Sequence, residues 1–172
     1  VRVARRKSTL PLTGTGEGRE KGRTSAPVLT TVPALTPLSH VHMPVQSGSD
    51  RVLGRMRRRY TREDYLGIVE RLRAHCADVV LTTDLIVGFP GESDSEFRET
   101  LSLIEEVGFI DSYSFKYSRR PHTKALAYAD EEIPPGVITD RLRELHEIQR
   151  KLTLDYHFSR VGRHAEIRVE GA

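Results

Sequence analysis

The sequence predicts an α/β protein built from parallel strand–helix–strand units. Three observations carry this prediction: short apolar runs rich in β-branched residues alternate with longer stretches of helical period, turn residues follow the strand runs, and two helical stretches open with a capping box. Connections as long as a helix favour parallel pairing with right-handed crossovers. From residue 41 onward we expect strands and helices to alternate, beginning and ending with a strand.

The first unit begins with "VHMPV", residues 41–45, a short apolar strand candidate. "QSGSD" follows, and its Gly and Ser favour a turn and a helix cap, with one or two helical turns over residues 50–57. Thr61 opens a longer helix, with Asp64 three residues later in a capping box. The helix carries one apolar stripe, made of Tyr65, Ile68, Val69 and Leu72.

Residues 79–89, "VVLTTDLIVGF", have the apolar and β-branched character of a strand buried on both faces. "PGE" ends this strand, and Ser93 with Glu96 forms a second capping box. The helix that follows has an apolar stripe of Phe97, Leu101 and Ile104. Residues 112–118, "SYSFKYS", place Tyr113, Phe115 and Tyr117 on one face of a third strand.

A Pro-containing loop leads to a long helix over about residues 136–158, marked by Ile138, Leu142, Leu145, Ile148 and Leu152. Gly162 is its expected stop, and "AEIRVEGA" ends the chain as a short alternating strand. Three parallel strands with helices on one side form an open arc, so the first strand has an uncovered edge. Either the N-terminal segment covers that edge, or a segment that should precede residue 40 is missing.

Composition limits the class of protein. The 172 residues suffice for one domain, and 37% hydrophobic with 30% charged residues is typical of a soluble globular chain. No apolar run approaches the roughly 20 residues that span a bilayer, and no secretory signal is recognisable. The single cysteine, Cys76, excludes an internal disulfide framework and a metal site made only of this chain's cysteines. These features suit a reducing cytoplasm.

The net charge of +3 is unevenly distributed. Residues 1–38 carry seven basic and two acidic residues, a net of +5, so the remaining residues carry a net of −2. This segment is rich in Thr, Gly, Pro, Arg and Ser and cannot bury enough apolar surface to offset its ordering entropy. We therefore expect a disordered basic tail. Such a tail can hold phosphate groups, although a solvated arm without a partner is the simpler interpretation.

Ligands of parallel α/β sheets bind at the carboxyl ends of the strands. Three segments fall there: "QSGSD" with neutral hydrogen-bonding groups, "GFPGE" with bare backbone and an apolar wall, and "SRRPHT" with two arginines. Together they suit a nucleoside-like ligand with a polyanion nearby. Taken singly, each is also explained as a turn, a cap or a solvated rim. His40 and His42 form an H-x-H pair that could ligate zinc, which leaves a zinc-dependent barrel hydrolase as an alternative.

The run "HMPVQSGSDRVLGRMRRRYTREDYLGIVERLR", with "TTDLIVGFPGESDSEFRETLSLIEEVGF" and "SYSFKYSRRPHTKA", closely resembles the radical SAM methylthiotransferases, in particular their MiaB-like tRNA-modifying branch. The resemblance implies a partial parallel (β/α) barrel, its last three βα units, over residues 39–160. Residues 161–172 would begin a C-terminal RNA-binding β module. The implied activity is methylthiolation of N6-prenylated adenosine next to the anticodon, with tRNA as the partner and no membrane.

The resemblance also implies site residues. The S-adenosylmethionine site would contain Gln46, Ser47, Gly48, Asp84, Ile86 and Gly88. Tyr117 and Arg120 would face the substrate adenosine. No catalytic residue and no metal ligand is predicted within this chain.

The chain departs from this family in its cysteines. The family binds S-adenosylmethionine on a [4Fe–4S] cluster held by a C-x3-C-x2-C loop and carries a second cluster as well, and cluster ligands are thiolates. One cysteine cannot supply them. We therefore expect a fragment that is inactive alone, from a truncated, frameshifted or wrongly started reading frame. A non-catalytic RNA-binding module is a further alternative; loss of salt-dependent tRNA affinity on deletion of residues 1–38 would favour it. The oligomeric state cannot be deduced.

Overall fold

The structure is a computed structural model that describes residues 40–119, 121 and 123–163. In chain order its elements are β1 (His40–His42), α1 (Asp50–Arg55), α2 (Arg62–His75), β2 (Val80–Val87), α3 (Asp94–Val107), β3 (Asp111–Lys116), the 3-10 helix η1 (Lys124–Glu131) and α4 (Pro135–Arg160). The expected alternation of strands and helices is confirmed over this range. The predicted tail at residues 1–38 and the terminal strand at 165–172 lie outside the described residues.

The three strands form one sheet in the order β1-β2-β3, and both pairs are parallel. The register pairs His42 with Thr82, and Asp84 with Tyr113. Because each connection returns the chain to the same end of the sheet, the carboxyl ends of all three strands lie together at one end, which we call the carboxyl edge; the opposite end is the amino edge. Within the described residues β1 pairs with β2 alone, so the predicted uncovered edge is present there.

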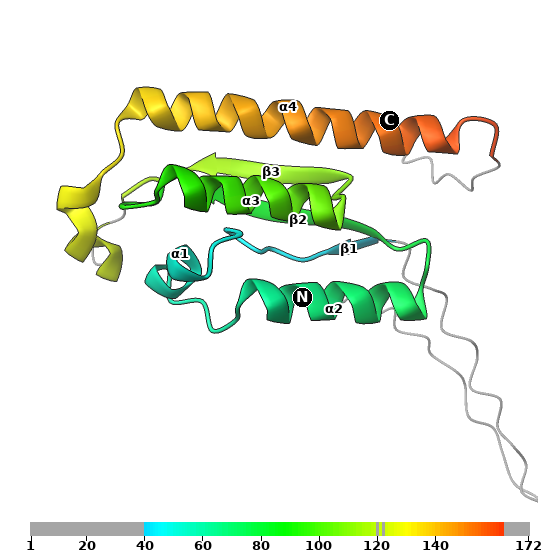
Figure 1. Ribbon diagram of the computed structural model, residues 1–172, viewed down its shortest axis with the longest axis horizontal. Helices are drawn as coiled ribbons and strands as arrows, with labels where there is room; N and C mark the ends of the chain where they lie inside the picture. Colours follow the sequence, from blue (N-terminus) through cyan, green and yellow to red (C-terminus); the bar gives the residue numbers. More distant parts are fainter. Residues whose placement is uncertain (1–39, 120, 122, 164–172) are drawn as a thin grey trace, which may run out of the picture. The chain divides into compact units, whose positions relative to one another are not determined.

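The two faces of the sheet differ in what they contact. Leu81, Leu85 and Val87 of β2 belong to one apolar core together with buried residues of α2, α3 and α4. Figure 1 shows α4 lying along β3, and α4 also contacts α3. Thr82, Asp84 and Ile86 alternate with the core residues along β2 and therefore point to the other face. That face holds the polar and aromatic residues of the candidate site.

Both predicted capping boxes are present. The hydroxyl of Thr61 accepts from the backbone N–H of Asp64, whose carboxylate accepts from the Thr61 backbone, and Ser93 and Glu96 do the same for α3. The predicted stripe of α3 is fully in the core. On α2 the buried stripe is narrower than predicted, because Ile68 is 37% exposed. The sequence thus located both helix starts correctly and overestimated the contact surface of α2.

Element boundaries differ from the prediction at the carboxyl edge. β1 ends at His42 instead of residue 45, yet Met43 still donates to the carbonyl of Thr82 at 2.9 Å. The segment after β3, predicted as a loop, contains the helix η1. None of the helices among the described residues is both long and apolar enough to span a membrane.

Candidate functional site

A cleft of about 780 Å³ opens at the carboxyl edge of the sheet. Its polar and charged lining consists of Gln46, Arg55, Arg57, Arg58, Asp84, Lys116, Ser118 and Thr123. Its apolar and aromatic lining consists of Met56, Ile86, Phe89, Phe115, Tyr117 and Ala125. A mostly apolar wall with a few convergent polar groups, at this volume, is typical of small-molecule sites. Four of the eight predicted site residues line it: Gln46, Asp84, Ile86 and Tyr117.

Gln46 is fixed by its backbone. Its N–H donates to the carbonyl of Asp84 at 2.8 Å, and its carbonyl accepts from Ile86 at 2.9 Å, so it extends the β1–β2 pairing by an isolated bridge. Its φ is 73°, in the left-handed region that a residue with a Cβ rarely occupies. Strained backbone of this kind concentrates at functional sites. With its backbone held in this conformation, Gln46 lines the cleft.

Asp84 is the one carboxylate among the residues that line the described cleft. His42 Nε2 lies 3.4 Å from its Oδ1, and the other ring nitrogen of His42 contacts Thr82 Oγ1 at 3.0 Å. His40 also contacts Thr82, at 2.9 Å. The two histidines therefore share a hydroxyl. Across the described part of the chain, no three histidine, cysteine or acidic side chains gather as a metal site, so nothing there favours the zinc alternative.

The aromatic wall comes from two neighbouring strand ends. The rings of Phe89 and Tyr117 meet edge to face with centroids 5.1 Å apart, and Tyr128 of η1 lies 6.4 Å beyond Phe89. The Tyr117 backbone N–H donates to Val87 at 2.8 Å, which aligns the two strand ends. This wall is the apolar surface that "GFPGE" was expected to provide. Arg120, the other predicted substrate contact, lies outside the described residues.

The loop behind this wall is held by a buried ion pair. Glu92 Oε2 accepts from the Gly88 N–H at 2.9 Å and from Arg141 Nη1 of α4 at 3.1 Å. Burial raises the pKa of Glu92, against the lowering effects of the Gly88 amide and of Arg141. Gly88 itself, at φ 79°, faces Ile138 of α4. The structure therefore places Gly88 under the cleft wall and not in its lining.

Ser47 and Gly48 lie against α3 and are absent from the cleft lining. The Ser47 hydroxyl is 3.3 Å from that of Thr100, and the Gly48 N–H donates to the same Thr100 hydroxyl at 2.9 Å. A Cβ on Gly48 would lie 2.5 Å from the carbonyl oxygen of Glu99. The sequence suggested that Gly48 admits a ligand close to the backbone, whereas in the structure α3 takes that place.

Three arginines of the run "RMRRRY" line the cleft, and the sequence reasoning did not assign them. Arg55 is held in place: Nη1 donates to Glu131 at 2.8 Å, and its guanidinium lies 3.8 Å from the centre of the Tyr128 ring. Arg57 and Arg58 are exposed, and their side chains make no hydrogen bond or ion pair with any described residue. A run of basic residues directly after the predicted ligand loop was the available signal.

The helix that carries these arginines is anchored to α3. Arg51 Nε donates to Glu96 Oε1 at 2.5 Å, and its Nη2 donates to Glu96 Oε2 at 2.8 Å and to the Gly91 carbonyl at 2.5 Å. The hydrogen bond from Arg51, with help from Ser93, lowers the pKa of Glu96 to about 2. This bidentate pair fixes the position of α1 relative to the "GFPGE" loop.

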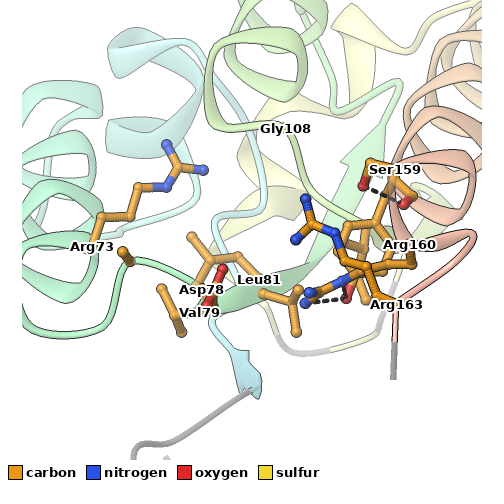
Figure 2. A pocket seen from close by; sticks show the side chains of 12 residues that line it. Arg73, Asp78, Val79, Leu81, Gly108, Ser159, Arg160 and Arg163 are labelled. Atoms are coloured by element: carbon orange, nitrogen blue, oxygen red, sulfur yellow. Dashed lines mark hydrogen bonds between the residues drawn. The ribbon is translucent and has the colours of Figure 1, made fainter. Parts of the chain in front are cut away.

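A second hollow, of about 190 Å³, lies at the opposite, amino edge of the sheet. Figure 2 shows Arg73 of α2 on one side and Arg160 with Arg163 on the other. Arg73 donates to the Val107 carbonyl, and the Arg160 guanidinium donates to the Tyr156 hydroxyl at 3.2 Å. The carboxyl ends of α2, α3 and α4 converge there, and arginines are favourable at such ends. We read this hollow as structural.

The family resemblance implies two cofactors, S-adenosylmethionine and a [4Fe–4S] cluster. The cleft volume and its mixture of Ile86, Phe89, Gln46 and Asp84 suit S-adenosylmethionine, a nucleoside with a charged tail. The residues present do not fit a [4Fe–4S] cluster. Cys76 is the chain's single cysteine, and it caps the end of α2 at the amino edge, away from the cleft.

Comparison with known proteins supports this fold. The profile of the Radical SAM superfamily matches residues 24–104, beginning within the range we assigned to the tail. Coproporphyrinogen III oxidase (HemN) from Escherichia coli, described as a radical SAM enzyme, superposes with a TM-score of 0.53 at 20% identity, over 66% of this chain and 27% of that one. The region therefore contains part of a radical SAM domain.

Three relatives are more similar to this chain in sequence, and each is named tRNA-2-methylthio-N(6)-dimethylallyladenosine synthase. Those from Geotalea uraniireducens and Sorangium cellulosum are 49% and 52% identical over 132 residues, 77% of this chain. That from Pelobacter propionicus is 49% identical over 139 residues. The resemblance to the radical SAM methylthiotransferases is confirmed. The chain spans 30%, 26% and 31% of these three relatives, respectively.

Proposed function

We propose that this chain forms the S-adenosylmethionine- and adenosine-binding part of a cytoplasmic tRNA methylthiotransferase. The three βα units would be part of a larger (β/α) barrel, and the substrate would be N6-prenylated adenosine next to the anticodon. The observation that carries the proposal is the carboxyl-edge cleft, where Gln46, Asp84, Ile86 and Tyr117 converge from all three strand ends. The named relatives support the choice of reaction.

The roles of these residues follow from their chemistry. Asp84 is the one acid among the described residues that line the cleft, so it would accept hydrogen bonds from ribose hydroxyls or from the ammonium group of S-adenosylmethionine. Ile86 and Phe89 offer apolar contact to an adenine ring. Gln46 can both donate and accept, which suits a nucleobase edge. Ser47, Gly48 and Gly88 would act indirectly, by fixing the loops behind the cleft.

A cluster would supply the cleavage of S-adenosylmethionine, and the family holds that cluster with three cysteine thiolates, whereas these 172 residues contain one cysteine. We therefore propose that this polypeptide alone binds the cofactor without cleaving it. After reconstitution with iron and sulfide, the expected result is no cluster absorbance and no 5′-deoxyadenosine. Detection of both would refute the proposed inactivity.

Binding is the direct test of the proposed site. Titration calorimetry with S-adenosylmethionine should detect binding to the chain, and Asp84→Asn should weaken it roughly tenfold, because a hydrogen bond to a charged group is lost. Asp140→Asn is the matched control, since Asp140 is exposed on α4 and outside the cleft. No binding to the unaltered chain, or equal weakening in both variants, would contradict the proposed site.

The non-catalytic RNA-binding module remains a second candidate, because the cleft itself is basic and aromatic. Among the described residues, four cations line it against one acid. An RNA affinity with no S-adenosylmethionine affinity would favour this candidate over the first.

A further inference from the structure

Two positively charged side chains at the cleft have no ion-pair partner among the described residues. Arg57 and Arg58 follow the end of α1, line the cleft and are exposed, and their guanidinium groups have no hydrogen bond or ion pair within the described range. By contrast, the other two cations of the described lining have partners: Arg55 pairs with Glu131, and Lys116 donates to the Thr139 hydroxyl. The described lining therefore holds two cations with partners and two without.

The backbone at this position is held in an uncommon conformation. Arg57 has a φ of 60°, in the left-handed region, which is unfavourable for a residue with a Cβ. Its N–H donates to Gly54 at 3.0 Å, and the Arg58 N–H donates to Leu53 at 2.9 Å. These two bonds satisfy two of the last carbonyls of α1 through backbone groups, so neither arginine side chain is needed to cap them. The turn presents both side chains at the mouth of the cleft.

The surface near these cations is aromatic. Phe115, which lines the cleft, is 55% exposed, and Tyr113 on the same face of β3 is 59% exposed. Exposed aromatic rings combined with a positively charged groove are the elements with which proteins bind single-stranded nucleic acid, because bases stack on the rings and phosphates meet the cations. An isolated nucleoside would use the rings but would leave both arginines without a partner.

We propose that Arg57 and Arg58 bind the phosphates on either side of a base inserted into the cleft, with Phe115 as a stacking surface. The substrate that the cleft takes beside S-adenosylmethionine is then a segment of single-stranded RNA and not a free adenosine. This inference rests on the proposed function and adds the residues that select a polynucleotide. Arginine suits the role because its planar guanidinium donates two parallel hydrogen bonds to a phosphate.

The test uses the full 172-residue chain and a short single-stranded RNA with a central adenosine, with binding measured by fluorescence anisotropy across salt concentrations. Arg57→Gln with Arg58→Gln should weaken binding at least tenfold at low salt. It should also reduce the slope of log K against log salt by roughly 1.4, for two lost phosphate contacts on a single strand.

Two controls remove the same charge elsewhere: Arg150→Gln with Lys151→Gln on the exposed side of α4, and Arg5→Gln with Arg6→Gln near the N-terminus. Both should change affinity less than threefold. An equal loss in all three double variants, or a loss confined to the N-terminal pair, would overturn the inference.

Titration of the Arg57→Gln, Arg58→Gln variant with S-adenosylmethionine separates this inference from the proposed function. Unchanged cofactor affinity together with lost RNA affinity is the expected result. If RNA affinity is unchanged while Asp84→Asn still weakens cofactor binding, the phosphate contacts are wrong and the proposed function stands. If the variant loses both ligands, the two arginines support the cleft as a whole and the inference fails.

Discussion

The sheet has a hollow at each end, and arginines line both. At the amino edge, Arg73 is bonded to the end of α3 and Arg160 to Tyr156, where three helix carboxyl ends meet. At the carboxyl edge, Arg57 and Arg58 have no partner among the described residues, and the hollow is about four times larger. The comparison teaches that arginine content alone does not identify a site. An arginine is a candidate for ligand binding when its guanidinium has no hydrogen-bond or ion-pair partner in the surrounding structure.

The anchoring of the two edges also differs. The carboxyl edge depends on ion pairs between segments far apart in sequence, Glu92 with Arg141 and Glu96 with Arg51. At the amino edge the hydrogen bonds of Arg73 and Arg160 go to a backbone carbonyl and a neutral hydroxyl, and the exposed Arg163 side chain makes no ion pair with a described residue. Substitutions at the carboxyl edge should therefore cost more stability than substitutions of the same kind at the amino edge.

The largest effect is expected from Glu92→Gln. It would leave the buried Arg141 guanidinium with only the exposed Asp94, 4.0 Å away, as a counter-charge, and breaking a buried pair in this way costs about 3 kcal/mol. Urea unfolding followed by circular dichroism measures the change. Glu147→Gln, on the exposed side of α4, should change the free energy of unfolding by less than about 0.5 kcal/mol, which is the usual effect of a substitution at a surface site. A loss below 1 kcal/mol for Glu92→Gln would show that this pair does not anchor the carboxyl edge.

Gly48 and Gly108 provide a matched pair of glycines, one at each edge. Gly48→Ala would force a Cβ against the backbone of α3, and overpacking of this kind costs about 2 kcal/mol. Gly108→Ala meets open space and has only the cost of its left-handed φ of 61°, about 1 kcal/mol. The same unfolding measurement compares them. The reverse order would mean that α3 can move away from the "QSGSD" loop.

Acid should weaken the carboxyl edge through Glu96. Its pKa in the folded chain, about 2, lies below its usual 4.5, so the stability it contributes is present above pH 4.5 and is lost as the pH falls toward 2. We expect Glu96→Gln to cost about 1.5 kcal/mol at pH 6, as for a hydrogen bond to a charged group. The difference from the unaltered chain should narrow by pH 3. A difference independent of pH would show that the carboxylate charge is not involved.

The smallest effect is expected at the amino edge. Arg73→Gln removes a side-chain hydrogen bond to the last carbonyl of α3 and should cost about 1 kcal/mol. Binding of S-adenosylmethionine and of RNA should stay unchanged, in contrast to Arg57→Gln with Arg58→Gln. A loss of RNA affinity in Arg73→Gln would assign a ligand to the amino-edge hollow and remove the contrast between the two ends.

Local patterns in the sequence determined the elements and their order. Thr61 with Asp64 and Ser93 with Glu96 specify helix starts because each box is satisfied within four residues. The apolar run of β2 and the helix-length connections specify parallel pairing, because few other arrangements bury both faces of such a strand. The convergence of Gln46, Asp84, Ile86 and Tyr117 was predictable for the same reason, since parallel strands end at one edge.

The tertiary structure decided which candidate residues reach the cleft. Ser47 and Gly48 are adjacent to Gln46 in sequence, but they contact α3, because the left-handed φ of Gln46 turns the chain between them. Likewise, only the partners of each arginine distinguish Arg57 and Arg58 from Arg73. A sequence fixes where charges occur along the chain, whereas long-range contacts determine which of them are neutralised and which are left to bind a ligand.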